Sequence, residues 1–221
     1  MDVVEAIKAR KSIRMYKPDP VPKKIIKEIL DIATRAPSSM NTQPWEFTVI
    51  AGEVLEKIKK ANVEMLNSGA TPSPDVPSIP FEGEYRQRQV DLAIELFKLM
   101  GIGREEKEKR VEWTRRGFRF FDAPAAIILS VDRSLSEARP MFDIGAIAQT
   151  IALTALNYGL GTCIQGQAIF FPQAVRKYAG IPDSKRMIIG ITIGYPDATF
   201  PANKIETKRV PADKVTTWCG L

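Results

Sequence analysis

The chain has 221 residues, 44% of which are hydrophobic, and it carries a formal net charge of +6 at pH 7. This length and composition are sufficient for one globular domain with a substantial core. The absence of histidine excludes Ser-His-Asp and Cys-His catalysis and the usual zinc sites. If the protein is an enzyme, we therefore expect a bound cofactor to supply the difficult chemistry. The two cysteines, Cys163 and Cys219, predict one buried thiol and one free thiol instead of a disulfide.

The distribution of apolar and charged residues narrows the classes of partner. No apolar run approaches the roughly 18 residues of a membrane helix, and the first residues have an early acid and no apolar core. We therefore expect a cytoplasmic protein with no membrane partner. The densest basic group, residues 104–119, is interleaved with four glutamates, as in a solvated helix face, so we expect no nucleic-acid partner. A few convergent arginines would still suit a small molecule that carries a phosphate.

A basic motif follows the first predicted helix, which covers residues 2–9. Arg10, Ser12 and Arg14 alternate, so an extended backbone places their side chains on one side and Ile13 on the other. Two guanidinium groups and a hydroxyl on one side can form a phosphate clamp. From the motif alone, a solvent-facing basic strand is the alternative interpretation.

The stretch from Ala36 to Trp45 is an unusually polar connection. It joins an amphipathic helix, predicted from Pro22 to Pro37, to an apolar strand predicted over residues 45–51. Such connections need only a few residues, yet this one holds two prolines, two serines, an asparagine, a threonine and a glutamine. It either holds a flat polar molecule or is a well-capped structural turn.

A proline-rich segment divides the chain after the next predicted helix. Its four prolines, within residues 69–84, exclude both helix and central strand. Two helices are then predicted over residues 85–100 and 104–118. We interpret residues 69–120 as an insertion or lid over a single domain that covers residues 1–221. The aromatic residues of the insertion either line a substrate pocket or pack its helices: Phe81, Tyr85, Trp113, Phe118 and Phe120.

The C-terminal part predicts buried elements and an irregular tail. Residues 124–131 predict a central strand, and residues 142–158 predict a helix so apolar that it must be buried in the core or at a subunit interface. The glycines of residues 161–167 would let backbone N–H groups approach a ligand. A helix over 172–179 and a last strand over 186–193 follow.

The tail, residues 194–221, lacks a clear periodicity. Such a segment is either frayed or wrapped over another subunit, and its apolar and aromatic content favours wrapping.

Five short motifs follow one another along the chain. They are Arg10-x-Ser12-x-Arg14, Pro37-Ser38-Ser39-x-Asn41-x-Gln43-Pro44-Trp45, Gly159-Leu160-Gly161, Ile164-Gln165-Gly166 and Arg209-Val210-Pro211. In type and order they resemble the FMN-dependent nitroreductase family. Each motif is weak alone, but the ordered combination spans nearly the whole chain outside the insertion.

The resemblance implies an α+β fold with a mixed central sheet flanked by helices. It also implies a homodimer that binds FMN at its interface, with the long apolar helix in that interface and the tail, residues 194–221, around the partner. Residues implied for the ribityl chain and phosphate are Arg10, Lys11, Ser12, Arg14, Lys208 and Arg209. Residues implied to approach from the opposite subunit are Pro37, Ser38, Ser39, Asn41 and Gln43. The backbone N–H groups of Gln165 and Gly166 are implied to address the reactive flavin nitrogen; many relatives have an acid in place of Gln165.

The implied activity is ping-pong, two-electron reduction of nitroaromatics, quinones or similar flat acceptors by NADH or NADPH through FMN. No side chain is an obvious proton donor, so solvent or substrate is expected to provide the proton. Other hypotheses remain open. A flavoenzyme of the same fold could perform dehalogenation, enone reduction or flavin breakdown; the protein could bind or store flavin without catalysis; and its basic pI alone supports nucleic-acid binding.

Overall fold

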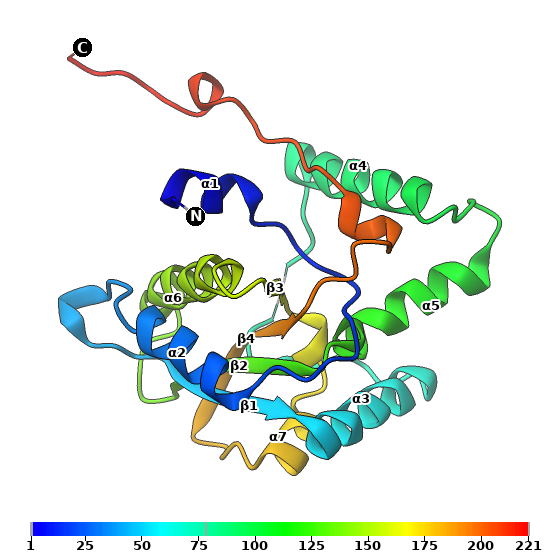
Figure 1. Cartoon of the computed structure of the whole chain (residues 1–221), viewed down its shortest axis with the longest axis horizontal. Coiled ribbons are helices and arrows are strands. Elements are labelled where there is room, and N and C mark those ends of the chain that lie inside the picture. The colour runs from blue at the N-terminus through cyan, green and yellow to red at the C-terminus, as the bar shows by residue number, and fades with distance from the viewer. Residues whose placement is uncertain (1, 78, 221) are drawn as a thin grey trace.

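The computed structural model describes residues 2–77 and 79–220. A β-sheet lies between two layers of helices, and α4 and the C-terminal tail lie to one side of this body (Figure 1). The helices are α1 (Val3–Ala9), α2 (Lys23–Ala33), α3 (Gly52–Asn67), α4 (Gly83–Leu99), α5 (Lys107–Phe118), α6 (Arg139–Leu156) and α7 (Pro172–Ala179). The strands are β1 (Glu46–Ala51), β2 (Ala125–Asp132), β3 (Gly161–Gln165) and β4 (Lys185–Gly194).

The strands are ordered β1-β2-β4-β3, and each neighbouring pair runs antiparallel. A parallel bridge joins Ser12 to Thr162 of β3, so the segment after α1 extends this edge of the sheet. The predicted α+β class with a mixed sheet flanked by helices is confirmed, and the bridge supplies its parallel pairing.

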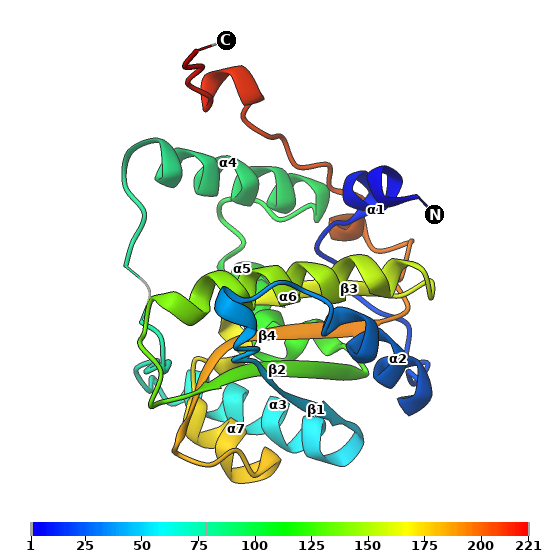
Figure 2. The same ribbon diagram turned by 90° about the vertical axis from the view of Figure 1, so that its left-hand side faces the viewer.

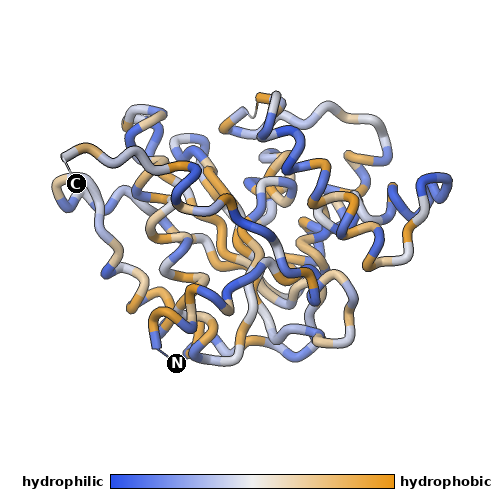
Figure 3. Tube along the Cα trace, turned by 90° about the horizontal axis from the view of Figure 1, so that it is seen from above, coloured by the Kyte–Doolittle hydropathy of each residue, from blue (hydrophilic) through white to orange (hydrophobic). Residues whose placement is uncertain are grey.

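The sheet separates two parts of the hydrophobic core. Successive residues of β2 alternate between them: Ile127 packs with the core on the α2 and α6 side, whereas Ile128 packs with the core on the α3 and α7 side. Residues 125–131 are all buried, which confirms the predicted central strand. Figure 3 shows hydrophobic residues gathered along the strands in the interior.

Local signals explain where most elements begin and end. The Asp2 carboxylate accepts hydrogen bonds from the N–H groups of Val4 and Glu5 and caps α1. Pro172 begins α7, and Gly180, with a left-handed φ of 69°, ends it, as predicted.

Some of the predicted elements differ from the structure. Helix α2 ends at Ala33, before Pro37, and a turn from Ala33 to Ala36 follows it. The helix stops early because a proline disfavours helical backbone in the residue before it. Helix α6 begins at Arg139, three residues early, since Pro140 is tolerated in a first turn. Residues 161–165 form the edge strand β3, although the glycines of residues 161–167 predicted only a segment that a ligand could approach.

Helix α4 is joined to the body through the start of the tail. Leu96 of α4 packs against Ala202 and Ile205, with Trp113 of α5 at the edge of this cluster. Residues 206–220 are exposed, and Figure 2 shows them extending away from the body beside α4. Within the described residues, no helix is long and apolar enough to cross a membrane.

Candidate functional site

A cleft of about 690 Å³ lies between residues 10–14, helix α4 and residues 205–210. This volume is within the range of small-molecule sites. The cleft is lined by six basic side chains and two carboxylates: Arg10, Lys11, Arg14, Arg88, Lys208 and Arg209, with Asp91 and Glu95. Ser12 lines it too. The surplus of positive charge and of N–H donors suits an anionic ligand such as a phosphate.

The segment that carries Arg10, Ser12 and Arg14 lies against β3 because a glycine leaves room for it. The Ile13 N–H donates to the Thr162 carbonyl over 2.9 Å. A Cβ on Gly161 would come within 2.4 Å of Ile13 Cγ1, so a larger residue there would displace the segment. Ile13 is buried while the three polar residues line the cleft, which confirms the predicted alternation.

The polar loop from Ala36 to Trp45 lines a different cleft. Pro37, Ser38 and Ser39 face Phe142 and Asp143 of α6 there. The described lining of this second cleft shares no residue with the first. Within one chain, the structure thus divides the predicted residues into two groups.

The same loop is also a well-capped turn. The Gln43 N–H donates to Ser38 Oγ over 2.9 Å, and Gln43 Nε2 donates to the Asn41 carbonyl over 3.1 Å. Met40, Asn41 and Gln43 have left-handed φ values of 50°, 58° and 47°, a costly backbone for residues other than glycine. Neither Asn41 nor Gln43 appears in the lining of the two clefts.

Gln165 and Gly166 lie where β3 ends, away from its bridge to Ser12. The Gln165 side chain is only 8% exposed. Among the described residues, neither its amide nitrogen nor its amide oxygen has a hydrogen-bond partner. A buried amide without partners is costly, which marks this position as one where a bound molecule or water can be accommodated.

Comparison with known proteins decides the family, since residues 7–195 match the nitroreductase family. The chain belongs to this family. It is 33% identical over 219 residues to a nitrobenzene nitroreductase from Ectopseudomonas oleovorans, covering 97% of this chain and 95% of that protein. It is 31% identical over 221 residues to a 4-nitrobenzoate reductase from Nocardioides sp. (strain LMS-CY), covering 96% and 87%.

A solved structure shares the whole architecture of this nitroreductase. The FMN-dependent nitroreductase NfnB from Mycobacterium smegmatis, in complex with NADPH, superposes with a TM-score of 0.91 at 28% identity. The match covers 99% of this chain and 100% of that chain.

Several cleft residues of this nitroreductase were missed by the sequence motifs. Arg88, Asp91 and Glu95 come from α4, which was predicted only as part of an insertion. Asn203 lies behind the cleft, 4% exposed, and accepts a hydrogen bond of 2.7 Å from the Arg14 N–H. Arg14 and Asn203 are 189 residues apart in the chain, so no local sequence pattern indicates this contact.

Two buried groups that can lose a proton, the Tyr16 hydroxyl and the Cys163 thiol, lie near the segment that carries Arg14. The Tyr16 hydroxyl contacts Thr192 Oγ1 at 2.6 Å and donates to the Ile13 carbonyl over 2.9 Å. Burial raises the pKa of Tyr16 and that of the Cys163 thiol, while the charge of nearby Arg14 opposes both shifts. Both groups are therefore neutral near pH 7. Cys163 is buried and Cys219 is exposed, as predicted.

Proposed function

We propose that the protein is an FMN-dependent oxidoreductase that uses NADH or NADPH to reduce nitroaromatics, quinones or similar flat acceptors. The family and the named activities of the relatives support the class of reaction. The convergence of residues 10–14 with Lys208 and Arg209 in one cleft carries the assignment to this chain.

The residues present fit FMN. Its phosphate needs convergent donors, which Arg10, Lys11, Ser12 and Arg14 and the tail cations Lys208 and Arg209 supply. The Arg209 guanidinium donates to Thr207 Oγ1 over 2.6 Å in the exposed part of the tail. Because this contact is not buried, the side chain can reorient toward a bound phosphate at little cost.

The ring of the flavin would lie toward the other end of β3. Gln165 lies three positions after Thr162, which is bridged to Ser12, and this spacing places the two about 10 Å apart along an extended strand. A molecule with an anionic end and a flat ring can therefore reach both. The backbone N–H groups of Gln165 and Gly166 would face the reacting edge of the ring, and the unpartnered Gln165 amide supplies neutral hydrogen-bonding groups there.

When bound, FMN supplies the two-electron chemistry that a chain without histidine lacks. The residues of the chain then anchor the phosphate, orient the ring and offer donors where negative charge develops. We assign no proton-donating side chain, so the proton comes from solvent or substrate.

We also propose that the site is completed in a homodimer. The loop containing Pro37, Ser38, Ser39, Asn41 and Gln43 would reach the flavin of the partner, which agrees with its separation from the phosphate cleft. Exposed apolar side chains support an interface: Val3 and Ile7 on α1, Phe142 on α6, Met40 in the loop, and Val215 and Trp218 in the tail. The start of the tail packs on α4 of its own chain, so the exposed part, residues 206–220, would wrap the partner.

The chain would form a single domain, residues 1–221, in which residues 69–120 are a lid over the active site. Helix α4 forms one wall of the cleft, and Phe81 and Tyr85 at its start are exposed, whereas Phe118 and Phe120 are buried in the core. The first pair is therefore available to an acceptor, and the second pair packs. The free thiols suit the reducing cytoplasm, where nicotinamide donors are available.

A steady-state screen of acceptors with both nicotinamides tests the proposal. We expect NAD(P)H-dependent turnover of nitrobenzoates or quinones that requires FMN. Turnover confined to halogenated substrates or enones would indicate another flavoenzyme of this fold. Bound FMN without turnover of any acceptor would indicate flavin binding or storage.

A further inference from the structure

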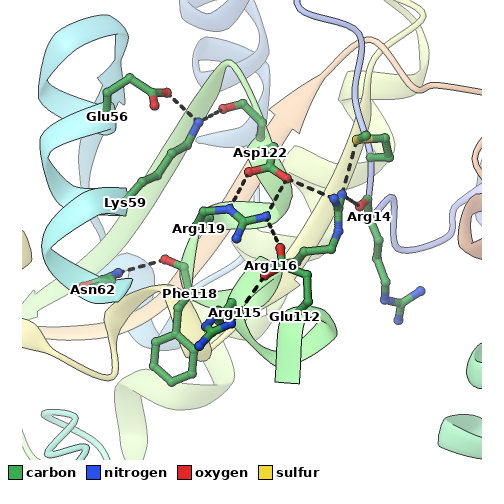
Figure 4. Close-up of polar contacts among 12 residues, drawn as sticks. Arg14, Glu56, Lys59, Asn62, Glu112, Arg115, Arg116, Phe118, Arg119 and Asp122 are labelled. Carbon is green, nitrogen blue, oxygen red and sulfur yellow. Dashed lines mark hydrogen bonds and ion pairs between the residues drawn. The ribbon is translucent and has the colours of Figure 1, made fainter. Parts of the chain in front are cut away.

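The main chain between Arg14 and Met15 is held from two sides by residues remote in sequence. From the tail, Asn203 accepts from the Arg14 N–H over 2.7 Å, and its Nδ2 donates to the Met15 carbonyl over 2.8 Å. From α5, Arg116 Nη2 donates to the Arg14 carbonyl over 2.9 Å. Figure 4 shows Arg116 reaching this main chain while the Arg14 guanidinium extends away from it.

Arg116 is itself fixed before it reaches Arg14. Its Nη1 lies 3.1 Å from Asp122 Oδ2, its guanidinium stacks 4.9 Å from the centre of the Phe200 ring, and its side chain is 13% exposed. Asp122 is in turn held by Arg119, whose Nε donates over 2.9 Å (Figure 4). A guanidinium held by an ion pair and a ring loses little further freedom when it donates to a carbonyl.

The backbone that places Asp122 is strained. Phe120, Phe121 and Asp122 have successive left-handed φ values of 58°, 51° and 57°. Each such non-glycine residue is costly, and a run of three persists only where the surroundings fix it. Phe120 and Phe121 are buried, and the turn brings Asp122 to both arginines.

We infer that Arg116 is a positioning residue for phosphate recognition: with Asn203 it fixes the Arg14 backbone, and thereby aims the Arg14 guanidinium into the basic cleft. The inference rests on the proposed FMN site. It ties helix α5 of the insertion to the cofactor, although α5 contributes no described residue to the lining of the cleft.

The test measures the affinity of the flavin-free full-length chain for FMN and for riboflavin, which lacks the phosphate. Flavin fluorescence reports binding of either ligand. For Arg116→Met we expect FMN to bind about tenfold more weakly, as for loss of a charge-assisted hydrogen bond, and riboflavin to change by less than about twofold. Arg116→Lys keeps one donor and should recover much of the loss. The matched control is Arg115→Met, because Arg115 instead donates to Asn67 on α3; it should leave both affinities unchanged.

The outcomes separate the two proposals. Wild-type protein that does not bind FMN would overturn the proposed function. Wild-type protein that binds FMN, with an Arg116→Met variant that loses no affinity or loses it equally for both ligands, would overturn only the role of Arg116. If Arg116→Met does not fold, the same comparison on Arg116→Lys decides, with a smaller loss expected for FMN alone.

Discussion

The backbone N–H of Ser39 donates a hydrogen bond to Oδ1 of Asp143 over 3.2 Å, although 104 residues separate them. Asp143 is buried in α6, so the contact fixes the polar loop against this helix. Phe142, the next residue, is 80% exposed beside it. A fixed loop next to an exposed apolar residue would suit the proposed interface with a second copy of the chain.

The first prediction concerns this interface. Phe142→Glu should give a monomer and at the same time weaken FMN binding, because a charge would be buried where the second subunit packs. Sedimentation and flavin fluorescence measure the two effects. The control is Val54→Glu, at an apolar residue that is 38% exposed but lies on α3, across the sheet. A monomeric variant that keeps wild-type FMN affinity would show that the loop does not serve the partner's site.

The second prediction concerns the phosphate clamp. Arg14→Ala should weaken FMN binding by about 1.5–3 kcal/mol, the contribution of a hydrogen bond to a charged group. Arg104→Ala removes an exposed arginine outside the described lining of the cleft and should have no effect. Equal FMN affinity of the two variants in a fluorescence titration would remove Arg14 from the site.

The third prediction concerns the proline-rich segment. The Asp75 carboxylate, 8% exposed, accepts from Arg133 over 2.7 Å and from the Met187 N–H over 2.8 Å, and it pairs with Arg176. Asp75→Asn should lower the free energy of unfolding by about 3 kcal/mol, because it removes the buried countercharge of Arg176 and leaves only the exposed Asp183 beside it. Denaturant unfolding measures the change.

The control for Asp75 is Asp183→Asn. Asp183 also pairs with Arg176, at 3.6 Å, but its side chain is 99% exposed. Its removal should cost less than about 0.5 kcal/mol. Similar losses for both variants would mean that Asp75 does not anchor the segment.

The fourth prediction concerns alkaline pH. Burial raises the pKa of Cys163 above its ordinary 9.0 and that of Tyr16 above its ordinary 10.0. The unfolded chain then loses these protons at lower pH than the folded chain, so stability is full below pH 9 and falls as the pH rises above it. Urea unfolding at several pH values measures the fall, which should be smaller in Tyr16→Phe. Equal slopes in both proteins would contradict the assignment to Tyr16.

The sequence predicted those parts of the fold and site that depend on neighbouring residues. Helix α7 covers residues 172–179 as expected, and the alternation of Arg10, Ser12 and Arg14 appears as expected, because helix ends and side-chain periods depend on neighbouring residues. Strand β3 was not predicted, since it has only five residues and forms through its pairing with β4, which is remote in the sequence.

The residues that hold the Arg14 backbone could not be predicted either, because their contacts join parts of the chain that are remote in sequence. Arg116 and Asn203 meet Arg14 across 102 and 189 residues, respectively. In the sequence, Arg116 belongs to the basic group interleaved with glutamates, which indicated only a solvated helix face. The strained turn that places Asp122 likewise begins with two phenylalanines, which rarely adopt left-handed backbone, so the sequence did not indicate it.

The most direct test of the central claim is the visible absorbance of the purified full-length protein with FMN, followed without oxygen as NADH or NADPH and then a nitrobenzoate are added. The account predicts a yellow protein whose colour is bleached by a nicotinamide and restored by the acceptor. A colourless protein that takes up no added FMN, or bound FMN that neither nicotinamide bleaches, would contradict it.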